Sequence, residues 1–377
     1  MSTTDKTLTA QLKVMTSQIT DKVYGCLIGG AIGDALGSPV EGWSQERIRK
    51  EYGKLDSFLP HPDPFFEEEP GAVSDDSVIR HFVCLAIVRQ GGRITPDEYA
   101  ETLLRQLHPD HVWLNQEIVL NKLQAGINPW ISGRGSIPTP GAAMAMAPIG
   151  IVNAGDPRQA YQDGFNIGSV TQDGVHRDAA ATIAAGTAEA LSPEATRETV
   201  IETMLEHSSE TLYRACDLSL DIAMDSNSVD EFVRRFYDDL LDWRWPGVTW
   251  DREQYRQGEL FSMSTLEIIP ATMGIFSICG DDADRCIVEA VNFGRDCDTI
   301  ATLIGNLVGA LDGASSLRQD WIDQCETVNR KVFEQIEDDS TDDFQSMAIR
   351  LVDVLKNERE RAKQREAELS EILGNTQ

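Results

Sequence analysis

Aromatic residues, basic residues and closely spaced cysteines are all scarce in this chain. Aromatic residues make up 7% of the 377 and hydrophobic residues 41%, a balance typical of a globular chain that argues against intrinsic disorder. The seven cysteines lie singly along the sequence, with no CxxC pair among them. That spacing excludes a zinc ribbon and a disulfide framework.

Long apolar runs are missing as well. No window of the chain approaches the roughly eighteen consecutive apolar residues of a membrane helix, and residues 1–20 contain no apolar signal segment. We therefore expect no membrane association and a reducing, cytoplasmic setting.

Acidic residues outnumber basic ones by 62 to 33, so the formal net charge is −29. A nucleic acid or an anionic membrane needs a face rich in lysine and arginine, and this chain is poor in both. We expect neither as a partner. Solubility is the simplest explanation of the charge, although a small anionic ligand is still compatible with it if a metal or local backbone N–H groups hold that ligand.

Helical patterns follow one another along most of the chain, and alternating strand patterns are almost absent. We predict an all-α fold with one catalytic domain over residues 21–330. Residues 1–20 are predicted to be a flexible N-terminal arm. Residues 331–377 include "LKNERERAKQREAELSEILGN", which indicates a charged helical C-terminal extension with few core positions. The sequence leaves the oligomeric state open.

Two acidic clusters stand at the starts of predicted helices. One is "SDDS" at residues 74–77, and the other places Asp296 and Asp298 directly before Thr299. A helix start needs one capping residue, and each cluster supplies two carboxylates with a neighbouring hydroxyl. Mg²⁺ and Mn²⁺ prefer such oxygen ligands. Spacing alone leaves capping and metal binding both open.

Four stretches of the chain carry a resemblance to a known family: "GCLIGGAIGDALGSPVEGW" (25–43), "SDDSVIRHFVCLAI" (74–87), "GAAMAMAPIGIVNAGDP" (141–157) and "GRDCDTIATLIGNLVGALDG" (294–313). The chain resembles the ADP-ribosylglycohydrolases, which include the dinitrogenase reductase-activating glycohydrolases, over roughly residues 21–325. The resemblance implies a compact, orthogonal multi-helix domain. Its cleft would hold a dinuclear metal centre of two divalent cations, Mg²⁺ or alternatively Mn²⁺.

The resemblance also implies the residues of the site. By position, the metal ligands would be Ser74, Asp75, Asp76, Asp296, Asp298 and Thr299. Serine at position 74 replaces the usual threonine and keeps the hydroxyl oxygen. The catalytic residues would be Glu41, Asp75 and Asp298, with Glu41 beside the ribose as an acid/base or substrate-gating group. We expect Asp34 to make structural hydrogen bonds inside its small-residue helix.

The glycine-rich loop 132–141 is the predicted place for a substrate diphosphate, because backbone N–H groups in such loops bind phosphate. Its candidate substrate-binding residues are Gly133, Gly135, Ser136 and Gly141. A plain connecting loop is an equally open interpretation.

This chain departs from the usual family pattern near the substrate. Ala145 stands where an arginine is usual, Gln172 replaces a histidine, and "GRDCD" replaces "GGDTD", which introduces Arg295 and Cys297. We expect Arg295 to pair with a carboxylate and Cys297 to pack in the core.

The predicted activity is hydrolysis of an N- or O-glycosidic bond. A dinuclear pair can chelate the 2′ and 3′ hydroxyls of a ribose, while a carboxylate assists an oxocarbenium-like transition state. The first hypothesis is removal of ADP-ribose from a modified side chain, as in an ADP-ribosylated protein, or from another ADP-ribosyl conjugate. The alternatives are an N-ribosyl hydrolase of nucleosides or other small ribosyl substrates, and a non-catalytic relative like the lens crystallins of the family.

Overall fold

The computed structural model describes residues 3–61, 69–107, 114–244, 264–334 and 343–374, and all regular structure in these ranges is helical. The α-helices are α1 Thr3–Gly37, α2 Gln45–Tyr52, α3 Asp75–Gln90, α4 Pro96–Gln106, α5 Leu114–Gln124, α6 Ala147–Val152, α7 Pro157–Gly168, α8 Gly174–Ala190, α9 Arg197–Glu206, α10 Glu210–Met224, α11 Val229–Arg244, α13 Thr265–Ile278, α14 Ala283–Val291, α15 Cys297–Asp312, α16 Gln319–Glu334 and α17 Phe344–Ile372. Short 3₁₀ turns lie at η1 Ser38–Val40, η3 Pro129–Ile131, η4 Pro140–Ala142 and η5 Ala314–Ser316. The all-α prediction is confirmed.

Helices α1 and α15 form the centre of the body and pack with their backbones in contact. Glycine recurs every fourth residue on one face of α1, so this face has no side chains to hold the two helices apart. A Cβ atom added at any of these glycines would lie closer than 3.0 Å to the α15 segment or to the residues just after it. The facing pairs are Gly25 with Gly309, Gly29 with Gly305, Gly33 with Ala301, and Gly37 with Asp298.

The order of these pairs shows that the two helices run antiparallel. The end of α1 therefore lies against the start of α15, and a Cβ at Gly37 would be 2.5 Å from the Asp298 Cα. Glu41 follows α1 by a single 3₁₀ turn. This packing brings residues near position 40 close to residues near position 298, although they are far apart in the sequence.

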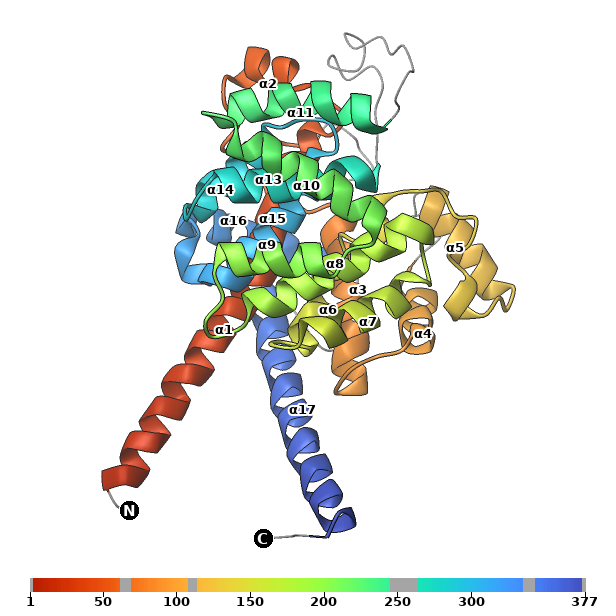
Figure 1. The fold of residues 1–377 in the computed structure, drawn as a ribbon, viewed down its shortest axis with the longest axis vertical. Helices are drawn as coiled ribbons and strands as arrows, with labels where there is room; N and C mark the ends of the chain where they lie inside the picture. Colours follow the sequence, from red (N-terminus) through yellow and green to blue (C-terminus); the bar gives the residue numbers. More distant parts are fainter. Residues whose placement is uncertain (1–2, 62–68, 108–113, 245–263, 335–342, 375–377) are drawn as a thin grey trace.

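The ends of the chain extend from the helical body on the same side (Figure 1). Helix α1 begins at Thr3 and continues unbroken past the predicted domain boundary at residue 21. The boundary predicted at residue 330 likewise falls inside α16. The charged C-terminal helix is present as α17, and its first turns pack into the core through Phe344, Met347 and Leu351.

One helix of the described ranges, Gln18–Val40, has the length and mean hydropathy of a membrane span. It comprises the C-terminal part of α1 and the turn η1, and 94% of its apolar window is buried inside the protein. Its apolar composition is accounted for by its place in the core.

Candidate functional site: an acidic centre at two helix starts

The start of α3 is capped without its aspartates. Ser74 occupies the N-cap, and its Oγ accepts a hydrogen bond from the Asp76 N–H at 3.3 Å. From α1, the carboxylate of Asp34 accepts the N–H groups of Ser74 and Ser77, each at 3.0 Å. Asp34 is thus structural, as predicted, but it bonds across to α3 and not within its own helix. The side chains of Asp75 and Asp76 are left for another role.

The start of α15 gives the same result. Asp296 stands at the N-cap position but its side chain makes no capping hydrogen bond. Asp296 is 3% exposed and Asp298 4%. In the described part of the chain, Asp296 Oδ2, Asp298 Oδ1 and Asp76 Oδ1 are buried oxygens without a hydrogen-bond partner. Buried polar atoms nearly always have partners, so helix capping does not explain these side chains.

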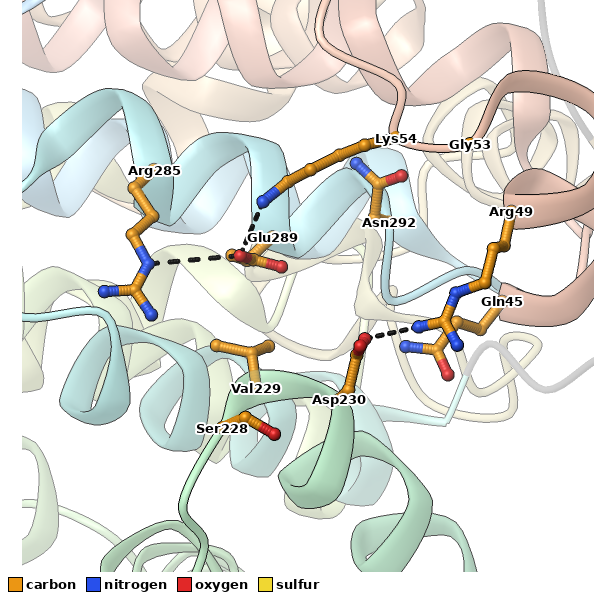
Figure 2. Close-up of a pocket in the computed structure, with 10 residues that line it drawn as sticks. All are labelled: Gln45, Arg49, Gly53, Lys54, Ser228, Val229, Asp230, Arg285, Glu289 and Asn292. Carbon is orange, nitrogen blue, oxygen red and sulfur yellow. Dashed lines mark hydrogen bonds and ion pairs between the residues drawn. The ribbon is translucent and has the colours of Figure 1, made fainter.

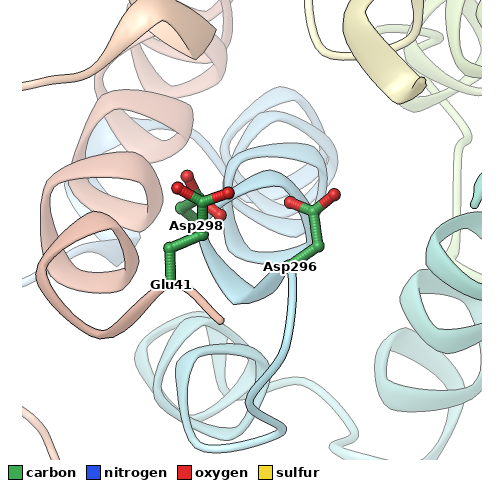
Figure 3. A group of neighbouring side chains, drawn as sticks. All are labelled: Glu41, Asp296 and Asp298. Carbon is green, nitrogen blue, oxygen red and sulfur yellow. The ribbon is translucent and has the colours of Figure 1, made fainter. Parts of the chain in front are cut away.

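Glu41, Asp296 and Asp298 form one compact group, which we call the acidic group. Their carboxylate oxygens include a set that lies within 4.8 Å of one another, and Figure 3 shows Glu41 and Asp298 side by side with Asp296 facing them. The α3 aspartates lie within electrostatic range of this group, since the charge of Asp76 raises the pKa of Asp298 and that of Asp75 raises the pKa of Glu41. The two clusters predicted from the sequence are therefore near each other in the fold.

The pKa values of these carboxyl groups show how unfavourable the cluster is by itself. Desolvation is the largest cause for each group. With repulsion from neighbouring carboxylates as the next cause, it raises the pKa of Glu41 to about 8 and of Asp75 to about 7. Desolvation raises the pKa of Asp296 to about 6, although hydrogen bonds from Thr299 and Asp298 act in the opposite direction. The pKa values of Asp76 and Asp298 lie well above the usual range for the same reasons. Neighbouring carboxylates cannot all ionise without a compensating positive charge.

A divalent cation fits this environment. The donors are all oxygens, which hard cations such as Mg²⁺ and Mn²⁺ require, and three of them are buried without partners. The predicted hydroxyl ligands lie at the same two helix starts. Ser74 and Thr299 are each 3% exposed, and the Thr299 side chain hydrogen-bonds Asp296. The chain thus contains an acidic site suited to divalent metal.

Asp75 has a partner that sequence reasoning missed. Gln116, on α5, donates from Nε2 to Asp75 Oδ2 at 2.8 Å. The preceding residue, Asn115, accepts the backbone N–H of Ile137 at 3.1 Å. Helix α5 therefore ties the glycine-rich loop to the acidic site, and nothing in the local sequence around residue 115 signals this link.

The glycine-rich loop does not present its backbone as predicted. The Gly133 N–H donates to Ser169 O at 2.9 Å, the Ser136 N–H to Gly133 O at 3.1 Å, and the Gly141 N–H to Thr139 Oγ1 at 3.3 Å. These three groups are used up in holding the loop together, so in this conformation they cannot bind a diphosphate. Gly135 is the fourth predicted substrate-binding residue, and it is exposed with φ at 69°. Among the described residues, no group accepts a hydrogen bond from its N–H.

Other contacts also brace this loop. Lys122 on α5 donates from Nζ to the carbonyl oxygens of Ser132 at 2.9 Å and Arg134 at 2.8 Å. Buried Gln172, at the position of the usual histidine, donates to Ile137 O at 3.1 Å and to Thr139 Oγ1 at 2.8 Å. The substitution at 172 therefore has a structural use.

The other departures from the family pattern lie in the core. Ala145 is fully buried, and Cys297 packs against the end of α1 with its thiol 3.6 Å from Gly37 O. Arg295 pairs with Glu267 on α13, and both side chains are 1% exposed. The expected packing of Cys297 and pairing of Arg295 are both observed.

Arg295 has a backbone conformation that favours glycine. Its φ of 64° is the one positive value among the described non-glycine residues. Its N–H donates to Trp43 O at 2.6 Å, and its carbonyl accepts the Gly42 N–H at 2.7 Å. Residues 42–43 follow Glu41 directly, so these bonds fix the Glu41 loop to the start of α15.

A surface pocket lies apart from the acidic group. It has a volume of about 300 Å³ and is lined by residues of α2, α11 and α14 with their connecting segments. Figure 2 shows that its cations face its own carboxylates: Arg49 pairs with Asp230, while Lys54 and Arg285 reach Glu289 at 2.7 and 3.9 Å. Each of the three cations is already in an ion pair with one of the two carboxylates, so this pocket gives no separate indication of an anionic ligand.

Comparison with known proteins places this geometry in a family. The sequence profile of the ADP-ribosylglycohydrolases matches residues 15–360. An uncharacterized protein of Archaeoglobus fulgidus is 30% identical over 301 residues, which cover 77% of this chain and 87% of that protein. The uncharacterized protein YegU of Escherichia coli is 24% identical over 329 residues, or 83% of this chain and 94% of YegU.

A solved structure shares the fold. An ADP-ribosylglycohydrolase-related protein complex contains a chain that superposes with a TM-score of 0.64 at 17% identity, covering 90% of this chain and 99% of that one. The predicted compact multi-helix architecture is confirmed by this likeness. The profile match spans nearly the whole sequence, and the chain therefore belongs to the ADP-ribosylglycohydrolase family, as a glycohydrolase-type enzyme of all-α fold.

Proposed function

We propose that the protein is a metal-dependent hydrolase that removes ADP-ribose from a modified side chain or from another ADP-ribosyl conjugate. The observation that carries this proposal is the convergence of buried, unpartnered carboxylate oxygens from α3 and α15 beside Glu41. A non-catalytic relative would have no need to keep so unfavourable a cluster.

Ser74, Asp75, Asp76, Asp296, Asp298 and Thr299 would hold two divalent cations, Mg²⁺ or alternatively Mn²⁺. When bound, the cations would supply a chelating contact for the ribose diol and Lewis-acid polarisation of a water. Their charge would also offset the repulsion that raises the carboxyl pKa values.

Glu41 is the residue suited to proton transfer. It is exposed to solvent, unlike Asp296 and Asp298, so it can exchange a proton with water, as a general acid or base must. In its neutral form it holds a proton that can pass to a leaving group. The backbone bonds of Arg295 to residues 42 and 43 keep this carboxyl beside Asp296 and Asp298.

A nucleoside or another small ribosyl compound is the second candidate substrate. It is favoured by the loop 132–141, where the N–H groups of Gly133, Ser136 and Gly141 are already used. Fewer free donors are then left for a diphosphate. We propose a small-molecule ribosyl or ADP-ribosyl partner, or an ADP-ribosylated protein, in a cytoplasmic setting.

A substrate panel tests the proposal. Chelator-treated protein, with Mg²⁺ or Mn²⁺ restored, is incubated with an ADP-ribosylated protein, with O-acetyl-ADP-ribose and with plain nucleosides. We expect metal-dependent release of ADP-ribose, reduced by about 100-fold or more in Glu41→Gln. Glu46→Gln, an exposed glutamate on α2, is the matched control and should keep the wild-type rate.

The outcomes separate the candidates. Cleavage of nucleosides with no release of ADP-ribose would replace the first candidate with the second. Protein that binds metal but hydrolyses nothing in the panel would contradict both enzymatic proposals.

A further inference from the structure

A pair of thiols lies at the turn between α13 and α14, outside the acidic site. Cys279 directly follows α13, and Cys286 lies near the start of α14. Cys286 Sγ lies 3.8 Å from the carbonyl oxygen of Gly280, the residue directly after Cys279, and the side chains of the two cysteines are hydrogen-bonded to each other. The residues between them, Gly280 to Asp282, form an exposed turn.

A buried arginine stands beside this pair. Arg197, at the start of α9, is 5% exposed and donates from Nη1 to Phe276 O at 2.8 Å and to Cys286 Sγ at 3.5 Å. In the described part of the chain, its Nε and Nη2 have no hydrogen-bond partner. The nearest carboxylate oxygen in an ion pair with it, on fully exposed Asp281, is 4.0 Å away.

A buried guanidinium needs a negative neighbour, because an uncompensated buried charge is strongly destabilising. Cys286 is the buried ionisable group in hydrogen-bond contact with this guanidinium, and its thiolate would supply such a charge. Its position in the first turns of α14 adds the favourable field of a helix N-terminus. The site therefore favours the thiolate form of Cys286, which is the nucleophilic form of cysteine.

Cys286 differs from every other cysteine in the chain. Its pKa is lowered, first by the hydrogen bond from Cys279 and then by Arg197. The pKa values of the other six cysteines are raised, and for Cys26 and Cys84 burial raises the pKa to about 12. The chain thus has one activated thiol, and a second thiol touches it.

We propose that Cys279 and Cys286 are a redox modification site, at which hydrogen peroxide converts the two thiols into a reversible disulfide. The Cys286 thiolate attacks one peroxide oxygen, the O–O bond breaks, and the departing hydroxide takes a proton to become water. Cys286 is then a sulfenic acid. The Cys279 sulfur attacks the Cys286 sulfur, the S–O bond breaks, and the oxygen leaves as water with the Cys279 proton.

The step balances, since two thiols lose two electrons and one peroxide becomes two waters. A small dithiol reductant restores the thiols by exchange. Disulfides of this kind in a reducing compartment are usually transient and redox-sensing. The proposal does not depend on which substrate the acidic site takes.

The test uses the full-length, reduced protein treated with hydrogen peroxide. Free thiols are counted after denaturation, and peptide mass spectrometry locates any disulfide. We expect the count to fall from seven to about five, because one disulfide consumes two thiols, with the bond between residues 279 and 286. A dithiol should return the count to its starting value.

Three cysteine variants identify the roles. Cys279→Ser should stop at a Cys286 sulfenic acid that dimedone traps, and Cys286→Ser should give neither product. Cys216→Ser, which removes a buried cysteine on α10, is the matched control and should still form the disulfide. Arg197→Met should slow the reaction about tenfold for each unit by which the Cys286 pKa rises, as the thiolate fraction falls.

Retention of all the thiols, at a peroxide dose that oxidises a cysteine-containing peptide, would overturn the proposal. So would a disulfide that joins other cysteines. The wild-type measurement decides this even if a variant fails to fold.

Discussion

Replacing Glu267 or Arg295 with methionine breaks an ion pair whose two side chains are each 1% exposed. Arg295 bonds to both carboxylate oxygens of Glu267, with Nη2 to Oε2 at 3.3 Å. Each single variant removes one charge of the pair and leaves the opposite charge buried. Because water cannot reach the remaining group, we expect each change to lower the free energy of unfolding by about 3–5 kcal/mol.

The double variant should behave differently from the sum of its parts. Replacing a buried ion pair by apolar residues of similar volume is often neutral, since the desolvation cost disappears together with the attraction. The left-handed backbone at residue 295 is unchanged in all three variants. We therefore expect the double variant to be more stable than either single variant, although the single losses sum to roughly 6–10 kcal/mol.

Urea denaturation measures these differences. The midpoint should fall in each single variant with an unchanged slope, and it should recover in the double variant. Glu210→Gln is the control, because it breaks an exposed pair with Arg214 on α10 and should cost about 0.5 kcal/mol or less. Single losses no larger than that of the control, or strictly additive losses, would refute the idea that this pair supports the site.

Other parts of the structure give further predictions. Asp298→Asn should lower metal affinity about tenfold or more while the circular dichroism spectrum is retained. Loss of a metal ligand should lower the affinity at least as much as loss of a residue that only hydrogen-bonds a ligand. Unchanged affinity would instead indicate that the role of Asp298 is helix capping. Without metal, Glu41, Asp75 and Asp296 hold protons that the unfolded chain releases, because their pKa values are raised to about 8, 7 and 6. The free energy of unfolding of the metal-free protein should therefore fall as pH rises from about 5 to 8, and its difference from that of the Mg²⁺-loaded protein should grow. A difference that shrinks over this range would contradict the assignment of these carboxylates to a metal site. Gly33→Ala places a Cβ against the α15 backbone and should lower the free energy of unfolding by about 1–3 kcal/mol or more. Gly53→Ala is the comparison, because nothing lies within 4 Å of the added atom there. It measures the cost of replacing glycine at an open site with positive φ. Equal losses in urea would show that close helix packing is not the reason for glycine at 33.

The parts of the site that could be predicted from sequence are those encoded locally. Asp296 and Asp298 stand two residues apart at a helix start, and the glycine spacing of α1 repeats every fourth residue, so both signals lie within short stretches. The all-α class follows from such patterns as well. The family resemblance then joined the two acidic clusters, which spacing alone could not do.

The contacts that complete the site link residues far apart in the chain. Asp34 bonds to Ser74 across 40 positions, and Gln116 bonds to Asp75 across 41. Tertiary packing sets such pairs, and no local pattern reports them. The glycine-rich loop shows the same limit, because its sequence indicates available N–H groups while neighbours such as Ser169 and Thr139 decide whether they are free.

Calorimetric titration of the chelator-treated protein with Mn²⁺ and with Mg²⁺ measures whether the acidic centre binds metal. We expect about two ions to bind per chain. At a free ion concentration a hundredfold above the Kd of an independent site, binding at that site adds roughly 2.7 kcal/mol to the free energy of unfolding. Binding should be abolished when Asp296 and Asp298 are both changed to asparagine, while the fold is kept. A wild-type protein that binds neither ion, or a double variant that binds both as tightly as the wild type, would contradict the assignment of the acidic centre as a metal site.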